Sequence, residues 1–510
     1  MKKIMLILIL VLASALRLWQ LGQVPNGITV DEAAIGYNAY AVFTTRRDEW
    51  LERLPISFRS FGDYKAPAAI YLLGPVIYFL GSEMWVLRLP FALFGIAAVW
   101  LFYLLIREIF YDSRRRETLA LLGAFLLATS PWHLHFSRLG FEAGMALTLT
   151  VGALYLFYAY LRQGRWWQLG MAVLLAAATL YTYHSNKLIT PLLFAFLAWQ
   201  HRHQLWQRRR SVSWALLGGL LLLLPFLYDA LWLNGLTRMQ SSTVLTQAAA
   251  PLQKATAFVT NLSSYLHPDF LLRGQTDGNL RHGDGRFGVL SWPTYLLALS
   301  APIWLWWRRR QLTKTTVAAS AFIYWYLLVA LAPAALAIDP QHSVRSLSAA
   351  PALLLLAVLS LHQFAQLPRR FWRLCVSLLV AAEILSLLLY QRHYYQDYAR
   401  LSADSFHSGY VEVFSYLKDT DKQQVQQIIF TNDYEHAYIH ALFVFRLSPL
   451  AWQGGLLNIF KFTEQINAGD LAQTNTIVVA SQYDDMGEAT PDHQIVGSDG
   501  EVKFKIFHQQ

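Results

Sequence analysis

The sequence has little charge and almost no cysteine. Only 15% of its 510 residues are charged, whereas 55% are hydrophobic. A soluble protein of this size would lack the polar side chains needed to cover its surface, so the composition indicates a membrane protein. The single cysteine, Cys375, lies in an apolar block, which excludes an intrachain disulfide and a cysteine-based metal cluster. Redox chemistry is therefore not expected.

No internal repeat is evident, and the positive charge is not gathered into one domain. The net charge is +10, but the basic residues lie between hydrophobic blocks, where they orient membrane spans towards the inner leaflet. This layout favours membrane lipids as partners and excludes nucleic acid.

The hydrophobic blocks predict an α-helical polytopic membrane protein with about eleven transmembrane helices, at roughly 20 residues for each crossing. The expected spans are 4–21, 85–108, 118–132, 140–161, 168–183, 187–200, 213–233, 290–307, 315–337, 347–364 and 373–391. The N-terminus resembles a signal peptide, but its apolar stretch continues through Trp19, so we interpret it as an uncleaved first span. Segment 66–80 contains two prolines and fits a helix at the membrane interface.

Basic clusters predict the orientation of these spans. They fall in alternate loops, on the same side as Lys2 and Lys3, and that side is expected to be the cytoplasm. The clusters are Arg114–Arg116, Arg162 with Arg165, Arg208–Arg210, Arg308–Arg310 with Lys314, and Arg369, Arg370 and Arg373. The outward-facing segments are then 22–84, 133–139, 184–186, 234–289, 338–346 and everything after 391.

The chain is expected to divide into a membrane domain, 1–391, and a small extracytoplasmic α/β domain, 392–510. In the tail, residues 410–418 have helical periodicity, and the apolar, β-branched runs at 428–431 and 476–480 predict strands.

The first outer segment carries two adjacent acids, Asp31 and Glu32, beyond the end of the first span. One interpretation is a helix N-cap, because Thr29 or Asp31 precedes helix-forming residues. The other is catalytic, because a general base at the membrane surface can take a hydroxyl proton while a lipid-anchored substrate lies in the bilayer. The two interpretations are compatible.

The same segment reads Phe-Arg-Ser-Phe-Gly-Asp-Tyr-Lys-Ala-Pro at 58–67. Its cations suit contact with lipid headgroups. Alternatively, Lys65 supplies a point charge for a phosphate leaving group, while Tyr64 stacks on a sugar or adds a hydrogen bond.

Glu142 begins an otherwise apolar span, and an ionisable group at membrane depth is a candidate functional residue because its burial is costly. The alternative is a salt bridge to Arg138, four residues earlier. His133 and His135 resemble a pair of metal ligands, but no third ligand lies nearby in sequence, so a divalent metal stays an open alternative.

Two further outer segments add cations and imidazoles, Tyr181–Lys187 with His184 and 339–345 with Arg345. Each also fits an aromatic belt or a helix cap. Acids, bases and phosphate-binding cations from four loops are thus expected to converge on one membrane face.

These motifs together resemble the GT-C glycosyltransferases of family 39 type, which include protein O-mannosyltransferases and the lipid A aminoarabinose transferase. The resemblance rests on the acidic pair after the first span, Gly-Asp-Tyr-Lys-x-Pro at 62–67 and Ser-Arg-x-x-x-Glu at 137–142. Tyr-Thr-Tyr-His-Ser at 181–185, followed by Pro191, also looks like bacterial members, as does His-Ser-Gly-Tyr-Val-Glu at 407–412, which opens the tail. Many relatives show Lys-Pro-Pro or His-Pro-Pro, whereas this chain has Lys65-Ala66-Pro67.

The resemblance implies the GT-C fold, a polyprenyl-phosphate-linked sugar as donor and an inverting displacement. The compact loops and the lack of an obvious retention signal suggest a bacterial plasma membrane. It implies that Asp31 is the catalytic acid of the first loop, that Glu142 is a second acidic residue of the site, and that Lys65 holds the lipid phosphate. In the reaction we expect, Arg345 assists Lys65, His184 bonds the donor, Glu142 positions the acceptor or orients Arg138, and Glu32 and Tyr64 also bind substrate. The acceptor is a protein, a lipid or a polysaccharide.

Two other function classes stay open. A flippase for lipid-linked sugars would show internal repeats and midplane polar residues on broken helices, whereas here the ionisable residues gather at one face. A non-catalytic sensor would bind carbohydrate through its tail and tolerate loss of the loop acids.

Overall fold

The computed structural model describes residues 2–233, 237, 243–246, 250–275, 278–338, 341–420 and 425–509. These residues form two compact units. The first contains Met1–Trp19, Phe61–Ala68 and Phe91–Gln391, and the second contains Gln20–Ser60, Ala69–Pro90 and Arg392–Gln510. The division into domains 1–391 and 392–510 stays a prediction.

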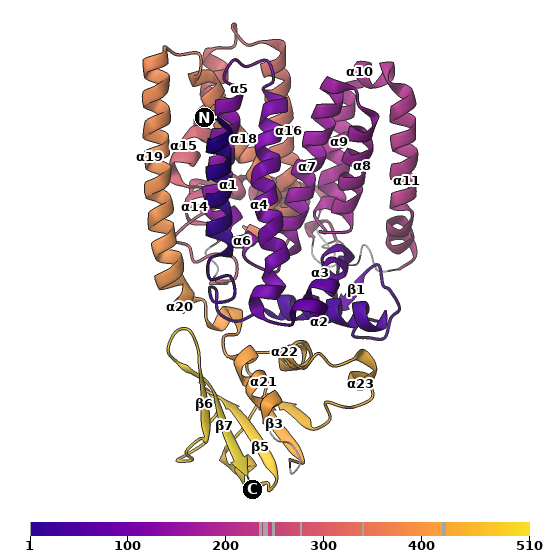
Figure 1. Cartoon of the computed structure of the whole chain (residues 1–510), viewed down its shortest axis with the longest axis vertical. Helices are drawn as coiled ribbons and strands as arrows, with labels where there is room; N and C mark the ends of the chain where they lie inside the picture. The colour runs from indigo at the N-terminus through magenta and orange to yellow at the C-terminus, as the bar shows by residue number, and fades with distance from the viewer. Residues whose placement is uncertain are drawn as a thin grey trace. The chain divides into compact units, whose positions relative to one another are not determined.

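The first unit is a bundle of helices (Figure 1). Its helices are α1 (Lys2–Leu18), α4 (Met84–Ile109, which begins in the second unit), α5 (Arg116–Thr129), α6 (Pro131–Ser137), α7 (Glu142–Gln163), α8 (Trp166–Leu180), α9 (Asn186–Gln200), α10 (Arg202–Gln207), α11 (Arg209–Trp232), α13 (Pro251–Leu266), α14 (Pro268–Arg273), α15 (Trp292–Trp307), α16 (Lys314–Ala335), α17 (Ser343–Ser346), α18 (Ala350–Phe364) and α19 (Arg369–His393). The protein is therefore mostly helical, as predicted.

A helix occupies each of the eleven predicted spans. Among the described residues, six helices are long and apolar enough to cross a membrane, or seven if α5 and α6 form one bent span. Those two helices meet at 59°. Ser130 ends the first, and its side chain accepts a hydrogen bond from the backbone of His133 while Pro131 begins the second, so the sequence restarts the helix in a new direction. The number of crossings stays a prediction.

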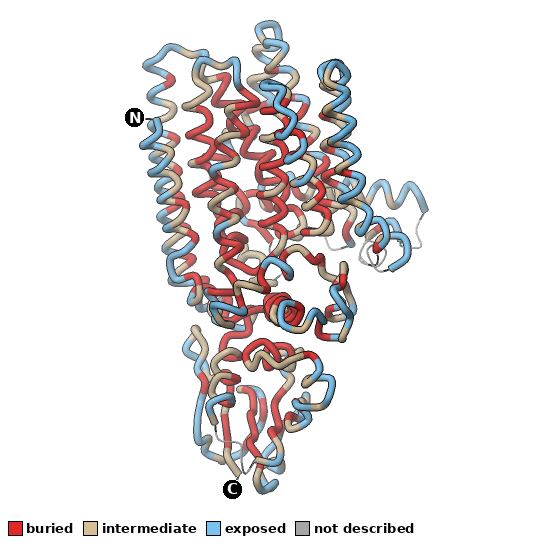
Figure 2. The backbone as a smooth tube through the Cα atoms, turned by 45° about the vertical axis from the view of Figure 1, so that its right-hand side comes forward, coloured by how far each residue is buried: buried red, intermediate tan, exposed pale blue. Residues whose placement is uncertain are grey.

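Burial separates the inner helices of this unit from the outer ones (Figure 2). In α18 every residue from Ala350 to Gln363 is buried, whereas α11 buries only Gly219 and Asp229. Because both helices are strongly apolar, the exposed apolar surface of α11 suits contact with lipid.

The second unit contains the tail sheet together with elements of the first outer segment. Its strands and helices are α2 (Val30–Thr45), β1 (Phe58–Ser60), most of α3 (Pro67–Leu80), α20 (Ala399–Leu401), α21 (Tyr410–Asp419), β3 (Gln427–Thr431), α22 (Ala437–Phe445), α23 (Pro449–Gln453), β4 (Phe460–Thr463), β5 (Thr476–Ser481), β6 (His493–Val496) and β7 (Val502–Gln509). The predicted tail helix and both predicted strands are confirmed.

The tail sheet has the strand order β4-β3-β5-β7-β6. The strand β3 runs parallel to β4 and β5, and β7 is antiparallel to its neighbours. Helix α21 lies on this sheet, where the rings of Phe414 and Phe430 stack at 4.7 Å. Helix α2 packs on α22, and a Cβ at Gly36 would approach Phe443 to 2.5 Å, so only glycine permits this close packing.

Candidate functional site

Thr29 starts α2 with a capping box. Its hydroxyl accepts a hydrogen bond from the Glu32 backbone N–H at 3.1 Å, and the Glu32 carboxylate accepts one from the Thr29 N–H at 3.0 Å. The N-cap interpretation is therefore confirmed, with Thr29 as the cap. This geometry directs Glu32 into the protein.

Glu32 forms a fully buried ion pair with Arg88 of α4. The Arg88 Nε lies 2.9 Å from Glu32 Oε1, and both side chains have no exposed surface. Sequence reasoning missed Arg88, although an arginine inside an apolar span is a signal for a buried partner. Both carboxylate oxygens accept hydrogen bonds inside the protein, so Glu32 positions the start of α2, and its assignment to substrate binding stays a prediction.

The same arginine holds the segment that leads into α2. Its two terminal nitrogens donate to the carbonyl oxygens of Pro25 at 2.7 Å and Gly27 at 2.6 Å. Asp31 follows as the second residue of the helix and is half-buried. A carboxylate in the first turn is stabilised by the positive end of the helix dipole. The buried network therefore fixes the backbone from which Asp31 projects.

In the first unit, the predicted lysine and histidine motifs meet. The His184 Nε2 donates to the backbone carbonyl of Tyr64 at 2.8 Å, and the Ala68 N–H donates to the carbonyl of Tyr181 at 2.9 Å. The two bonds lie on either side of Lys65, the last residue of β2 (Asp63–Lys65), so the loop between α8 and α9 sets the position of the Lys65 backbone. One ring nitrogen of His184 is thus engaged by the protein.

Arg138 is buried at the end of α1. Its Nη1 donates to the carbonyl oxygens of Leu16, Arg17 and Trp19 at 3.1, 3.2 and 2.8 Å. These carbonyls lack partners within the helix, and a cation at a helix C-terminus is favourable. The contacts give Arg138 a structural role, and its assignment to substrate binding stays a prediction.

Glu142 begins α7 beside residues from the long outer segment. The ring centres of its neighbour Phe141 and of His282 are 6.3 Å apart, and the ring centres of His282 and His342 are 4.3 Å apart. Sequence reasoning missed His282, because no pattern in segment 234–289 marked it. Much of that segment is described, and residues 234–236, 238–242, 247–249 and 276–277 lie outside the described residues.

Arg345 lies in α17, next to the same cluster. The backbone N–H of His342 donates to the Tyr265 hydroxyl at 2.9 Å. Burial raises the pKa of Tyr265 to about 12, although this donor and the charge of Arg345 act in the opposite direction. The hydroxyl of Tyr265 thus connects the long outer segment, 234–289, to the outer segment 338–346. Asp339 and Pro340 of the latter segment lie outside the described residues. Within this unit, residues of these two outer segments are in contact, and the convergence of the outer loops on one membrane face stays a prediction.

The two histidines considered as metal ligands have other partners. The Nδ1 of His133 accepts a hydrogen bond from Arg17 Nη2 at 2.7 Å, and His135 Nε2 donates to the Arg281 carbonyl at 2.9 Å. Among the described residues, no three His, Cys, Asp or Glu side chains are grouped to hold a metal ion.

Comparisons with known proteins agree with this architecture. Residues 64–232 match the model of the family described as dolichyl-phosphate-mannose-protein mannosyltransferase. ArnT from Cupriavidus metallidurans bound to undecaprenyl phosphate is 11% identical, with a TM-score of 0.57 over 94% of this chain and 93% of that chain. This chain has the GT-C glycosyltransferase fold.

The GT-C fold is also seen in a second set of similar structures. The apo oligosaccharyltransferase of Archaeoglobus fulgidus is 13% identical, with a TM-score of 0.55 over 94% of this chain and 69% of that chain. The same archaeal enzyme, AglB, in complex with an inhibitory peptide and a dolichol-phosphate is 14% identical, with a TM-score of 0.55 over 87% of this chain and 63% of that chain. No curated protein matches the sequence.

Proposed function

We propose that this GT-C protein transfers a sugar from a polyprenyl-phosphate donor to an acceptor hydroxyl on the extracytoplasmic side of the membrane, with inversion at the anomeric carbon. The observation that carries the proposal is the pair of contacts that fixes Lys65, through His184 on Tyr64 and through Tyr181 on Ala68. A lysine held on a constrained strand is suited to a phosphate, because its charge need not be reorganised during the reaction. The similar ArnT structure contains undecaprenyl phosphate, and the similar AglB structure contains a dolichol-phosphate.

In the proposed reaction, Asp31 accepts the proton of the acceptor hydroxyl. The hydroxyl oxygen forms a bond to the anomeric carbon as the bond from that carbon to the phosphate oxygen breaks, and the electron pair leaves with the polyprenyl phosphate. Lys65 and Arg345 neutralise the departing phosphate. Because phosphate is a good leaving group, no acid is needed to protonate it, unlike the two-carboxylate arrangement of glycoside hydrolases.

We assign Glu142 to positioning the acceptor and His184 to positioning the donor-binding strand. The half-buried Glu142 begins α7 beside the cluster of Phe141, His282 and His342, where its carboxylate can accept hydrogen bonds from acceptor hydroxyls. The acceptor is a protein, a lipid or a polysaccharide, and in this proposal its contacts with Glu142 and the neighbouring residues select it.

The test is transfer from a panel of radiolabelled polyprenyl-phosphate sugars by the purified full-length chain in detergent, with membrane extract as acceptor. Wild-type protein is compared with Asp31→Asn and with Asp112→Asn, the same change at an exposed residue of a predicted cytoplasmic loop. Transfer by wild type and by Asp112→Asn, but not by Asp31→Asn, supports the proposal. Movement of donor across liposomes without transfer would instead support a flippase.

A further inference from the structure

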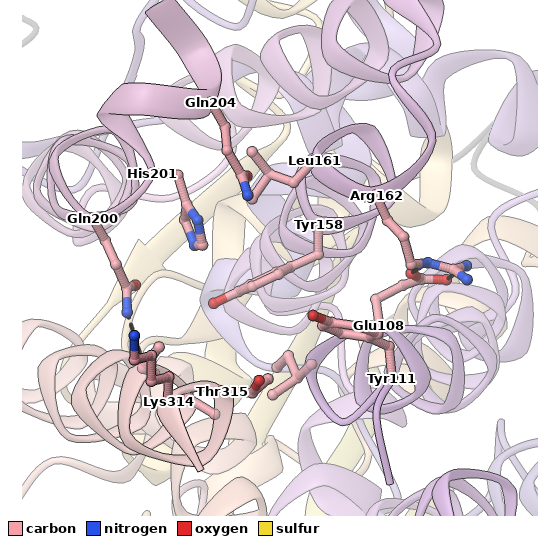
Figure 3. Close-up of a pocket in the computed structure, with 13 residues that line it drawn as sticks. Glu108, Tyr111, Tyr158, Leu161, Arg162, Gln200, His201, Gln204, Lys314 and Thr315 are labelled. Atoms are coloured by element: carbon pink, nitrogen blue, oxygen red, sulfur yellow. Dashed lines mark hydrogen bonds and ion pairs between the residues drawn. The ribbon is translucent and has the colours of Figure 1, made fainter. Parts of the chain in front are cut away.

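A cavity of about 350 Å³ lies in the first unit, between the ends of several helices (Figure 3). It is enclosed by the C-terminal ends of α4 and α7, the junction of α9 and α10, and the start of α16. Its lining residues are Glu108, Ile109, Tyr111, Tyr158, Leu161, Arg162, Gln200, His201, Gln204, Lys314, Thr315, Ala318 and Ala319. Several of them are next in sequence to basic clusters that are predicted to face the cytoplasm, whereas the proposed reaction takes place at the outer loops.

Two buried polar atoms of this cavity have no hydrogen-bond partner among the described residues. They are the Oε1 of Gln200 and the Nε2 of His201. The Gln200 Nε2 is bonded to the Ala318 carbonyl at 2.9 Å, so its amide is fixed with the oxygen available as an acceptor. Buried polar groups are normally satisfied, so these atoms indicate a ligand that carries hydroxyl groups or bound water.

The cavity also has an uncompensated positive charge. Its one carboxylate, Glu108, is held by the Nε and Nη2 of Arg162 at 2.5 and 2.6 Å, and this pair neutralises itself. Lys314 lies at the first position of α16, where the helix dipole adds to its positive charge. An anion is therefore favoured beside Lys314.

A second cavity, of about 420 Å³, shares Gln200, Lys314 and Ala318 with the first. Its other lining residues are Phe196, Trp199, Arg202, Leu312, Val317 and Ala321. Apart from the two cations and Gln200, this lining is apolar. Trp199 is 62% exposed and Val317 is 52% exposed, as expected for a groove between α9 and α16 that faces lipid.

A second cation lies at the apolar groove. The Arg202 guanidinium lies 5.7 Å from the centre of the Trp199 ring, which keeps it beside the groove. Lys314 and Arg202 thus flank the region where the polar cavity and the apolar groove share residues.

We propose that the two cavities together bind one anionic glycerophospholipid with a hydroxylated headgroup. Its phosphate lies between Lys314 and Arg202, its headgroup hydroxyls meet Gln200 and His201, and an acyl chain follows Phe196 and Trp199. A small soluble anion would leave the apolar groove unused. A zwitterionic choline lipid would carry no net charge for the cations and no hydroxyl for the buried acceptor.

The test measures lipid binding to the full-length chain in detergent, by native mass spectrometry and by the thermal unfolding midpoint. The probes are phosphatidylglycerol, phosphatidylcholine with the same acyl chains, and soluble glycerol phosphate. Wild type is expected to bind phosphatidylglycerol and to gain thermal stability from it alone. Lys314→Gln removes one charge-assisted hydrogen bond and is expected to weaken that affinity about tenfold.

Two variants separate this site from the general attraction of a basic surface. Arg310→Gln lies in the same basic cluster but lines neither cavity and is expected to bind phosphatidylglycerol like wild type. Ala321→Trp fills the apolar groove and is expected to lose lipid binding while Lys314 is retained, which also provides a test if Lys314→Gln does not fold. The proposal is overturned if Arg310→Gln weakens binding as much as Lys314→Gln, if phosphatidylcholine binds equally well, or if glycerol phosphate alone stabilises the protein. None of these readouts depends on transferase activity.

Discussion

Arg88 and Glu32 form an ion pair with no exposed surface, at 2.9 Å between Nε and Oε1. The pair does more than neutralise two charges. Arg88 also donates to two carbonyls of the segment before α2, and Glu32 completes the cap of that helix. A single buried group thus connects α4 to the residues on either side of Asp31.

Glu32→Gln is expected to destabilise the protein by about 3–5 kcal/mol, because it leaves Arg88 charged and buried without its counter-charge. The measurement is the unfolding midpoint in detergent. Glu117→Gln is the matched control, since its partner Arg107 is 34% exposed, and a change of about 0–1 kcal/mol is expected there. Equal losses in both variants would contradict the positioning role of Glu32.

Asp31→Asn is expected to fold normally and to lose at least about a hundredfold in turnover, the usual contribution of a general base. Asparagine keeps the size of the side chain and a polar group in the first turn of α2, so the unfolding midpoint should stay close to that of wild type. The measurement is single-turnover transfer with bound donor. Retained turnover would move the base elsewhere, and Glu142→Gln would be assayed next.

His184→Phe keeps the ring but removes the donor to Tyr64, and it is expected to raise the KM for the polyprenyl-phosphate donor about tenfold. The turnover number should fall as well, because Lys65 neutralises the departing phosphate, but less than in Asp31→Asn, since His184 acts only through the position of Lys65. Ser185→Ala, one residue along the same loop, is the control. A fall in turnover at unchanged KM would argue against this positioning role.

The buried carboxyl of Asp48 is expected to make the stability of the second unit depend on pH. Burial raises the pKa of its carboxyl to about 6, although two backbone N–H donors, from Glu52 and Trp50, act to lower it. Because the pKa is raised on folding, its contribution to stability is complete below the ordinary value of 3.8 and is lost as the pH rises through about 6. Asp48→Asn should therefore have a higher unfolding midpoint than wild type at pH 7.5, and the two should converge near pH 4. The exposed Asp112→Asn is the control, and a difference between wild type and Asp48→Asn that does not vary with pH would contradict the prediction.

The helices were predictable from the sequence because the patterns that specify each one lie within a short stretch of chain. Apolar blocks located a helix at each of the eleven predicted spans, and apolar, β-branched runs located β3 and β5. The helices α10, α13, α14 and α17 were not predicted. The cap at Thr29 was also predictable, since its partner Glu32 is three residues away. The number of crossings is harder, because α8 and α9, at 15 residues each, are shorter than one full crossing at the usual rise.

The partners of the candidate site residues were not predictable, because they are distant in sequence. Arg88 lies 56 residues from Glu32, and His184 lies 120 residues from Tyr64. Arg138 lies at the break between α6 and α7 and donates to carbonyl oxygens more than a hundred residues away, and its place in the sequence gives no sign of these partners.

The second unit combines segments that are far apart in the sequence, and this affects how it folds during synthesis. Ser408 donates a hydrogen bond to Asn26 across 382 residues of chain, and α2 packs on α22. At a synthesis rate of about 5–20 residues per second, roughly 20 to 80 seconds pass between the synthesis of Asn26 and that of Ser408. During that interval the segment bearing Asp31 is already translated and has no tail to pack against. Until the tail has been synthesised, α2 lacks its packing partner α22, so a product truncated before α22 is expected to leave the segment that bears Asp31 without this support.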